Sequence, residues 1–322
     1  MASGRVAYLN GAFVPESEAK ITLFDSQNHM GDMVHENTRT FGHRPFKLRE
    51  HMERLYYSMA AVEIDCGLTI EQMEAVTLEL LRRNEHTLAP EEDCFFIHDV
   101  SRGPHEYYAE VFPEGLGPVI GIYLWPLTRI LANRARLYES GVNAVIPRQR
   151  HVPTRFIDPK VKSRSRLHYQ MAELEMRQWG PDAWAILLDE DGFLTEGTAA
   201  NFLLVKDGTL LSPEPRIILR GVTRQTVIEM AEKTGIGFVE KNLEPYDILT
   251  ADEAFFTTTS IFMMTATRFN GRPIGDGHVG PVYRRLANAF VESIGVDFIK
   301  QARLCAERLG VDWQSPQQEH GD

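Results

Sequence analysis

The stretch Ile157-Asp158-Pro159-Lys160-Val161-Lys162-Ser163-Arg164-Ser165-Arg166-Leu167 sets two lysines among arginines. A nearby like charge disfavours the protonated form of a lysine, and neutral lysine is the nucleophile that forms Schiff bases with aldehydes. Taken alone, the stretch is better explained as a solvated basic loop. The residues themselves do not choose between Lys160 and Lys162 as the reactive amine.

A second stretch, Thr195-Glu196-Gly197-Thr198-Ala199-Ala200-Asn201, follows after about one helix and one strand. Together the two stretches resemble the fold type IV (class IV) pyridoxal-phosphate (PLP) aminotransferases. That family includes branched-chain, D-amino acid and (R)-amine transaminases, and aminodeoxychorismate lyase. The resemblance runs from Asn10-Gly11 to about Gly280 and implies an α/β (α+β) fold of two domains with the active site at their interface.

Length, composition and net charge exclude several kinds of protein. The chain has 322 residues, of which 43% are hydrophobic, so it is long enough for two domains. Its net charge of −11 argues against a nucleic-acid partner, which demands clustered basic residues. No apolar run approaches ~18 residues, so no membrane span is expected.

Three widely spaced cysteines, Cys66, Cys94 and Cys305, form no CxxC pattern. They are typical of reduced thiols in a cytoplasmic protein and indicate neither a disulfide frame nor a metal site. The first residues also lack the apolar run of a signal peptide.

The order of predicted elements suggests three segments: a small α/β domain over 1–125, a linker over 126–136 and a larger, PLP-binding domain over 137–322. Asn10-Gly11 predicts a β-hairpin, because both turn positions need positive φ. Helical spacing predicts helices over 49–61, 70–85, 167–179, 223–233 and 281–294, and a further helix is possible over 297–309. A strand is expected around His151, and the last residues, 314–322, are expected to be disordered.

Residues 33–41 predict a strand whose two faces are both polar. Its alternation places His35, Asn37 and Arg39 on one face, and Glu36 with two threonines on the other. Such a strand is unusual in a core and suggests that one face lines a wet pocket.

PLP needs an amine, a partner for its ring nitrogen and an anion site. The (R)-amine members of the family show Ile-Asp-Pro-x-Val-Lys, so the resemblance assigns the Schiff base to Lys162 and leaves Lys160 at the variable position. It makes Lys162 the catalytic residue that also moves the proton between cofactor and substrate carbons. It assigns Glu196 to the ring nitrogen, although an isolated glutamate here could simply end a strand.

The expected phosphate site combines an arginine with the start of a helix. His51-Met52-Glu53-Arg54-Leu55 matches the family pattern in which the arginine binds phosphate. Gly221-Val222-Thr223 opens a helix, whose free N–H groups attract anions. The resemblance places Val222, Thr223 and Thr259 at the phosphate. The alternatives are a surface arginine, a helix cap at Thr223 and a run of β-prone threonines.

The substrate site is less well marked. His35 replaces the aromatic residue usual in the family, and Arg39, Arg102 or His105 could bind a carboxylate or be surface charges. Ser260, with Thr259, could offer backbone N–H groups to that carboxylate. The family's tyrosine position after the lysine holds Leu167.

The sequence therefore predicts a PLP-dependent transaminase that moves an amino group between an amino acid or amine donor and a 2-oxo acid acceptor. The pattern, including Ile274-Gly275-Asp276-Gly277, is most like the branched-chain members, and a homodimer is implied. The alternatives are an (R)-amine or D-amino acid transaminase and a lyase of the aminodeoxychorismate type. A further hypothesis is that the chain is not an enzyme but a non-catalytic anion-binding protein with the same fold.

Overall fold

The computed structural model describes residues 4–113 and 115–314, so most of the tail expected to be disordered lies outside it. The chain forms two compact units. The first ends at Leu127 and takes in Pro159–Arg166, and the second consists of Thr128–Asp158 and the chain from Leu167 onward.

The first unit is built on a six-stranded antiparallel sheet with the strand order β2-β1-β6-β5-β3-β4. The Asn10-Gly11 hairpin is confirmed: Leu9 pairs with Ala12, and both turn residues have positive φ. The strands are β1 (Val6–Leu9), β2 (Ala12–Pro15), β3 (Met33–Phe41), β4 (Arg44–Pro45), β5 (Cys94–Ser101) and β6 (Val119–Pro126).

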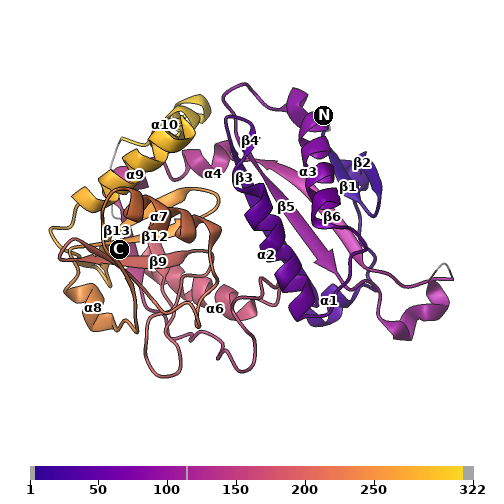
Figure 1. Ribbon diagram of the computed structural model, residues 1–322, viewed down its shortest axis with the longest axis horizontal. Coiled ribbons are helices and arrows are strands. Elements are labelled where there is room, and N and C mark those ends of the chain that lie inside the picture. The colour runs from indigo at the N-terminus through magenta and orange to yellow at the C-terminus, as the bar shows by residue number, and fades with distance from the viewer. Residues whose placement is uncertain (1–3, 114, 315–322) are drawn as a thin grey trace. The chain divides into compact units, whose positions relative to one another are not determined.

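Two helices, α2 (Leu48–Ala61) and α3 (Ile70–Asn84), lie along this sheet (Figure 1). Their apolar faces bury Met52, Leu55 and Met73 against Val34 and Phe96 of the strands. Thr69 begins α3 with a capping box, in which its side chain accepts from the Gln72 N–H. Shorter helices in this unit are α1 (Ser26–Met30) and the 3₁₀ turns Glu16–Glu18, Glu85–Thr87 and Glu106–Val111.

The lysine stretch packs on the first unit, although it was expected in the larger domain. Ser163 bridges to Val34 of β3, and the Arg164 N–H donates to the Met33 carbonyl at 2.9 Å. β3 pairs with β5 along one edge, and residues 162–164 bond the backbone of Met33 and His35 along the other.

The second unit is built on a sheet in the order β11-β10-β9-β12-β13-β7-β8, with β14 on β13. Its strands are β7 (Val142–Val145), β8 (Ala183–Ala185), β9 (Asn201–Lys206), β10 (Thr209–Ser212), β11 (Phe238–Glu240), β12 (Glu253–Thr258), β13 (Phe262–Phe269) and β14 (Arg272–Pro273). Its helices are α4 (Thr128–Ala132), α5 (Leu137–Ser140), α6 (Leu167–Met176), α7 (Val222–Lys233), α8 (Pro245–Leu249), α9 (Pro281–Ile294) and α10 (Phe298–Leu309), with a 3₁₀ turn at Arg177–Trp179.

Helices α7 and α9 both contact β12 (Figure 1). Buried Glu253 of that strand accepts the N–H groups of Val282 and Tyr283 at 2.7 and 2.8 Å, and so caps the start of α9. The possible helix over 297–309 is present as α10, and Asp297 caps it through two N–H groups.

The stretch expected as a linker, 126–136, is partly helical. Leu127, Leu131 and Ala135 are buried at helical spacing, and α4 packs against α10. The strand expected around His151 is absent in the described structure, where these residues form a loop.

Candidate functional site

Lys162 is held by its main chain from both sides. Its N–H donates to Ser58 Oγ of α2 at 3.1 Å, and its carbonyl accepts the His35 N–H of β3 at 2.9 Å. The root of this lysine side chain is therefore fixed by a helix and a strand of the first unit.

His35 is the neighbour of Lys162 on β3, and its imidazole is buried. The side chain is 1% exposed, and neither ring nitrogen has a hydrogen-bond partner in the described part of the chain. Burial, followed by the charges of Lys162, Arg164 and Arg166, holds the pKa of His35 well below its ordinary value. The ring is therefore neutral at pH 7 and offers one donor and one acceptor.

Arg54 is an ion-pair partner with little exposure, so its interpretation as a surface residue is wrong. Its side chain is 11% exposed, and its Nε and one Nη donate to the two oxygens of Glu36, each at 2.7 Å. His51 Nδ1 lies 3.0 Å from the same carboxylate. Burial raises the pKa of Glu36, but Arg54 and His51 outweigh burial and hold it well below its ordinary value.

Glu196 is the buried carboxylate of the second unit, with 5% exposure. Its Oε2 accepts from Asn201 Nδ2 and from the Leu219 N–H, both at 3.0 Å. These donors are neutral and fixed by the fold, so they orient the carboxylate without neutralising its charge.

The other oxygen of Glu196 faces two residues that sequence reasoning did not place in the site. The Tyr169 hydroxyl donates to Oε1 at 3.1 Å, and His151 Nε2 lies 3.7 Å from Oε1 and 3.2 Å from the tyrosine hydroxyl. Tyr169 lies in the first turn of α6, whereas Leu167, at the position where the family carries tyrosine, is 75% exposed.

The start of α7 lies against Asn201. Gly221 is the N-cap residue, and a Cβ there would come within 2.0 Å of Asn201 Oδ1. No side chain caps the helix, so Val222 and Thr223 present the unpaired N–H groups of its first turn. Only glycine permits this close approach.

Asn201 also ties Glu196 to β12, because it pairs with Thr257 in the β9–β12 register. Thr259 and Ser260 follow directly in the turn between β12 and β13, and both are half-buried. The Tyr138 hydroxyl fixes that turn by donating to the Ile261 carbonyl at 2.7 Å. Within the second unit, the fold thus brings Glu196, the start of α7 and the Thr259 turn around one asparagine.

The remaining candidates have structural contacts. Arg39 is buried, donates to the Thr40 carbonyl at 3.1 Å and lies over the Phe41 ring at 3.9 Å. His105 caps a 3₁₀ turn and stacks on Tyr107.

Arg102 is also engaged. It binds Asp32 at 2.6 Å and donates to the carbonyls of Glu63 and Val62 at 3.0 and 2.7 Å. A substrate role for Arg39, Arg102 or His105 stays a prediction.

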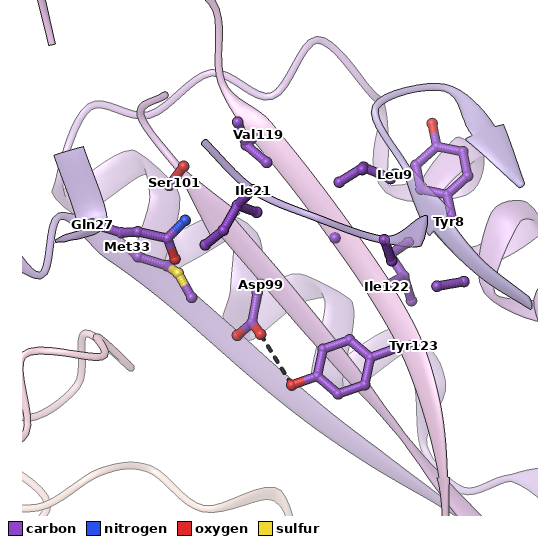
Figure 2. Close-up of a pocket in the computed structure, with 13 residues that line it drawn as sticks. Tyr8, Leu9, Ile21, Gln27, Met33, Asp99, Ser101, Val119, Ile122 and Tyr123 are labelled. Atoms are coloured by element: carbon purple, nitrogen blue, oxygen red, sulfur yellow. Dashed lines mark hydrogen bonds between the residues drawn. The ribbon is translucent and has the colours of Figure 1, made fainter. Parts of the chain in front are cut away.

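A cavity of about 220 Å³ opens in the first unit (Figure 2). Its lining is mostly apolar, with Asp99 and Tyr123 joined by a hydrogen bond of 3.3 Å. Arg164 of the lysine stretch also binds Asp99, at 2.8 Å. Because the charged group that lines this cavity is a carboxylate, the cavity is a poor site for a carboxylate ligand.

Residues 4–113 and 115–314 contain neither a candidate membrane-spanning helix nor a candidate metal site. No helix there is long and apolar enough to cross a bilayer, and no group of three His, Cys, Asp or Glu side chains could hold a metal ion.

Residues 33–269 match the family described as amino-transferase class IV. A putative branched-chain-amino-acid aminotransferase of Methanocaldococcus jannaschii is 36% identical over 88% of this chain and 94% of its own length. A D-alanine aminotransferase of Bacillus licheniformis is 28% identical over 88% of this chain and 95% of its own. The branched-chain aminotransferase of Thermoproteus uzoniensis, solved with norvaline, superposes with a TM-score of 0.79 at 28% identity, covering 90% of this chain and 95% of that one.

Proposed function

The chain belongs to the class IV aminotransferases, and we propose that it moves an amino group between a branched-chain or related amino acid and a 2-oxo acid. It is a PLP-dependent transferase. Supporting this, a related branched-chain amino acid aminotransferase of 26% identity was solved in complex with N-(5'-phosphopyridoxyl)-L-glutamate and also with pyridoxamine 5'-phosphate. The branched-chain preference rests on the names of the relatives.

The residues present fit such a cofactor. The observation that carries the proposal is Glu196, a buried carboxylate oriented by two neutral donors beside an uncapped helix start. An anion in this setting is well suited to a protonated ring nitrogen. Bound PLP supplies an electron sink that stabilises negative charge at the substrate carbon.

Lys162 is the amine that holds the cofactor and moves the substrate proton in this proposal. The fixed main chain supports the role, since a general acid–base needs a defined position. Arg54, Val222, Thr223 and Thr259 are proposed to bind the phosphate. The uncapped first turn of α7 suits an anion.

For the substrate, His35 and Ser260 have the more suitable surroundings. The neutral His35 ring can donate to one substrate oxygen, and the turn that holds Ser260 is fixed by Tyr138. Arg39, Arg102 and His105 are further proposed carboxylate ligands, although each already makes contacts within the fold.

The test is to replace Lys162 by Ala and to compare it with Lys160→Ala as the matched control. We expect Lys162→Ala to lose the visible absorption of the bound cofactor and the amino-transfer half-reaction, and Lys160→Ala to keep both. A band that persists in Lys162→Ala and disappears in Lys160→Ala would reassign the amine.

A D-amino acid preference is the second candidate, because the D-alanine aminotransferase matches nearly the whole chain. Mixing the loaded enzyme with L-leucine, D-alanine and an (R)-amine, each without acceptor, separates the substrate classes by which compound bleaches the band. The lyase alternative predicts pyruvate release from aminodeoxychorismate without a 2-oxo acid.

We also propose a cytoplasmic homodimer. The cytoplasmic assignment is supported by Cys66, Cys94 and Cys305, which are all buried and form no disulfide in the described part of the chain. The dimer follows from the family resemblance, and sedimentation of the purified protein tests it.

A further inference from the structure

The hydrogen bonds around Glu196 Oε1 form a chain of three titratable side chains. His151 Nδ1 lies 2.8 Å from the Val152 carbonyl, His151 Nε2 lies 3.2 Å from the Tyr169 hydroxyl, and that hydroxyl lies 3.1 Å from Glu196 Oε1. All three residues belong to the second unit.

Proton counting restricts how this chain can be occupied. A carbonyl oxygen only accepts, so His151 Nδ1 must carry a proton to bond Val152. If His151 is neutral, Nε2 has a lone pair and takes the single Tyr169 proton, and the tyrosine then has none for Glu196. All three contacts are hydrogen bonds at once in two states: His151 protonated on both nitrogens beside a charged Glu196, or His151 neutral beside a Glu196 that carries the proton on Oε1.

We propose that His151 and Tyr169 are positioning residues that form a proton relay to Glu196 and so set the charge of the carboxylate proposed to face the cofactor ring. The inference rests on the proposed function for the identity of the cofactor. In one direction, His151 Nε2 gives its proton to the Tyr169 oxygen while Tyr169 gives its own to Glu196 Oε1. His151 ends neutral and Glu196 ends protonated, so no proton is gained or lost.

A relay that responds to pH needs a side chain that can change its charge. Imidazole is the side chain whose charge ordinarily changes between pH 5 and 8. The titratable groups that face His151 in the described part of the chain are Glu196, Tyr169 and, from the start of α6, His168, whose ring lies 4.1 Å from that of Tyr169. Asn201 and Leu219 hold the other oxygen with neutral donors and do not titrate in this range.

The contacts of the Tyr169 hydroxyl go beyond what packing of its ring requires. Its hydroxyl contacts two buried titratable groups, whereas the neighbouring Leu167 is exposed. Removing the hydroxyl should leave the ring packed and break only the proton path.

The experiment measures the dissociation constant of PLP and the absorption spectrum of the bound cofactor from about pH 5 to pH 9. Variants are Tyr169→Phe and His151→Gln, in which glutamine retains hydrogen bonding to Tyr169 without titrating. Matched controls are Tyr246→Phe and His278→Gln, both at exposed positions of the same unit. Circular dichroism checks that each variant is folded.

We expect a spectral and affinity change near neutral pH in the wild type and in both controls, and its loss in His151→Gln and Tyr169→Phe. Tyr169→Phe should also weaken PLP binding about tenfold, since it removes a hydrogen bond to a charged group. Folded variants that keep the wild-type pH dependence would overturn the relay and leave the proposed function intact. A wild type that binds no PLP would overturn the proposed function itself.

Discussion

Glu36 of the first unit and Glu196 of the second are both buried carboxylates, and their partners differ in charge. Glu36 is saturated by the Arg54 guanidinium, with His51 and the Asn37 N–H on the same oxygen. Glu196 has neutral donors on one oxygen and a tyrosine on the other. The first carboxylate is compensated by a fixed guanidinium charge, and the second is bound by uncharged donors and by a tyrosine that links it to His151. Stability should depend on the first and chemistry on the second.

The largest expected effect is on folding, from Glu36→Gln. The change leaves the buried Arg54 charge without its partner, which typically costs about 3–5 kcal/mol. Urea unfolding of Glu36→Gln measures it, with the exposed Glu50→Gln on α2 as control, expected within about 0.5 kcal/mol of wild type. Equal stabilities of the two variants would remove the contrast on which the comparison rests.

Glu196→Gln should show the opposite profile. The amide oxygen can still accept from Asn201 and Leu219, and its NH₂ can donate to the Tyr169 oxygen, so folding should change by less than about 1 kcal/mol. Loss of the charge should lower kcat by about 10²–10³. Steady-state kinetics against the exposed Glu232→Gln measure this. A variant that unfolds easily and retains its kcat would make Glu196 a structural residue.

Local sequence patterns were sufficient to predict many of the helices and strands. The alternation of residues 33–41 predicted a strand that places His35 and Glu36 on opposite faces, and β3 spans those residues. Helical spacing likewise predicted α2 and α7 to within a residue or so at each end. In each case, the deciding contacts lie within a few positions along the chain.

What the sequence did not reveal depends on contacts between distant residues. The docking of 159–166 on β3 comes from backbone bonds that any side chain could make, so no pattern marks it. His151 lies in a loop and Tyr169 on a helix, and only the fold brings both to Glu196. A paired tyrosine and histidine flanking the lysine stretch was the available signal, and it is a weak one.

Acid should destabilise the first unit through its buried histidines. Burial lowers the pKa of His98 to about 4, and burial also lowers the pKa of His51 and His35. Below about pH 6.5 the unfolded chain takes up protons that the folded chain refuses, so stability falls with pH down to the folded pKa. For His98 the loss reaches about 3 kcal/mol near pH 4.

Unfolding measured from about pH 7 to pH 4 checks this, with His98→Gln against the exposed His278→Gln. The His98 variant should lose less stability on acidification than the control. The same pH slope in both would show that His98 does not carry the effect, and would leave the acid response to His51 and His35.

The smallest expected effect comes from Arg102→Ala, which asks whether this arginine binds substrate. Its guanidinium is already shared among Asp32 and two carbonyls, and its side chain is half exposed, so the ion pair should contribute at most about 1 kcal/mol to stability. If these contacts are its whole role, KM for the 2-oxo acid should change less than about twofold, because no carboxylate contact is lost. A tenfold rise in KM with an unchanged kcat would instead identify Arg102 as a carboxylate-binding residue, and would mean that the pairing with Asp32 gives way when substrate is present.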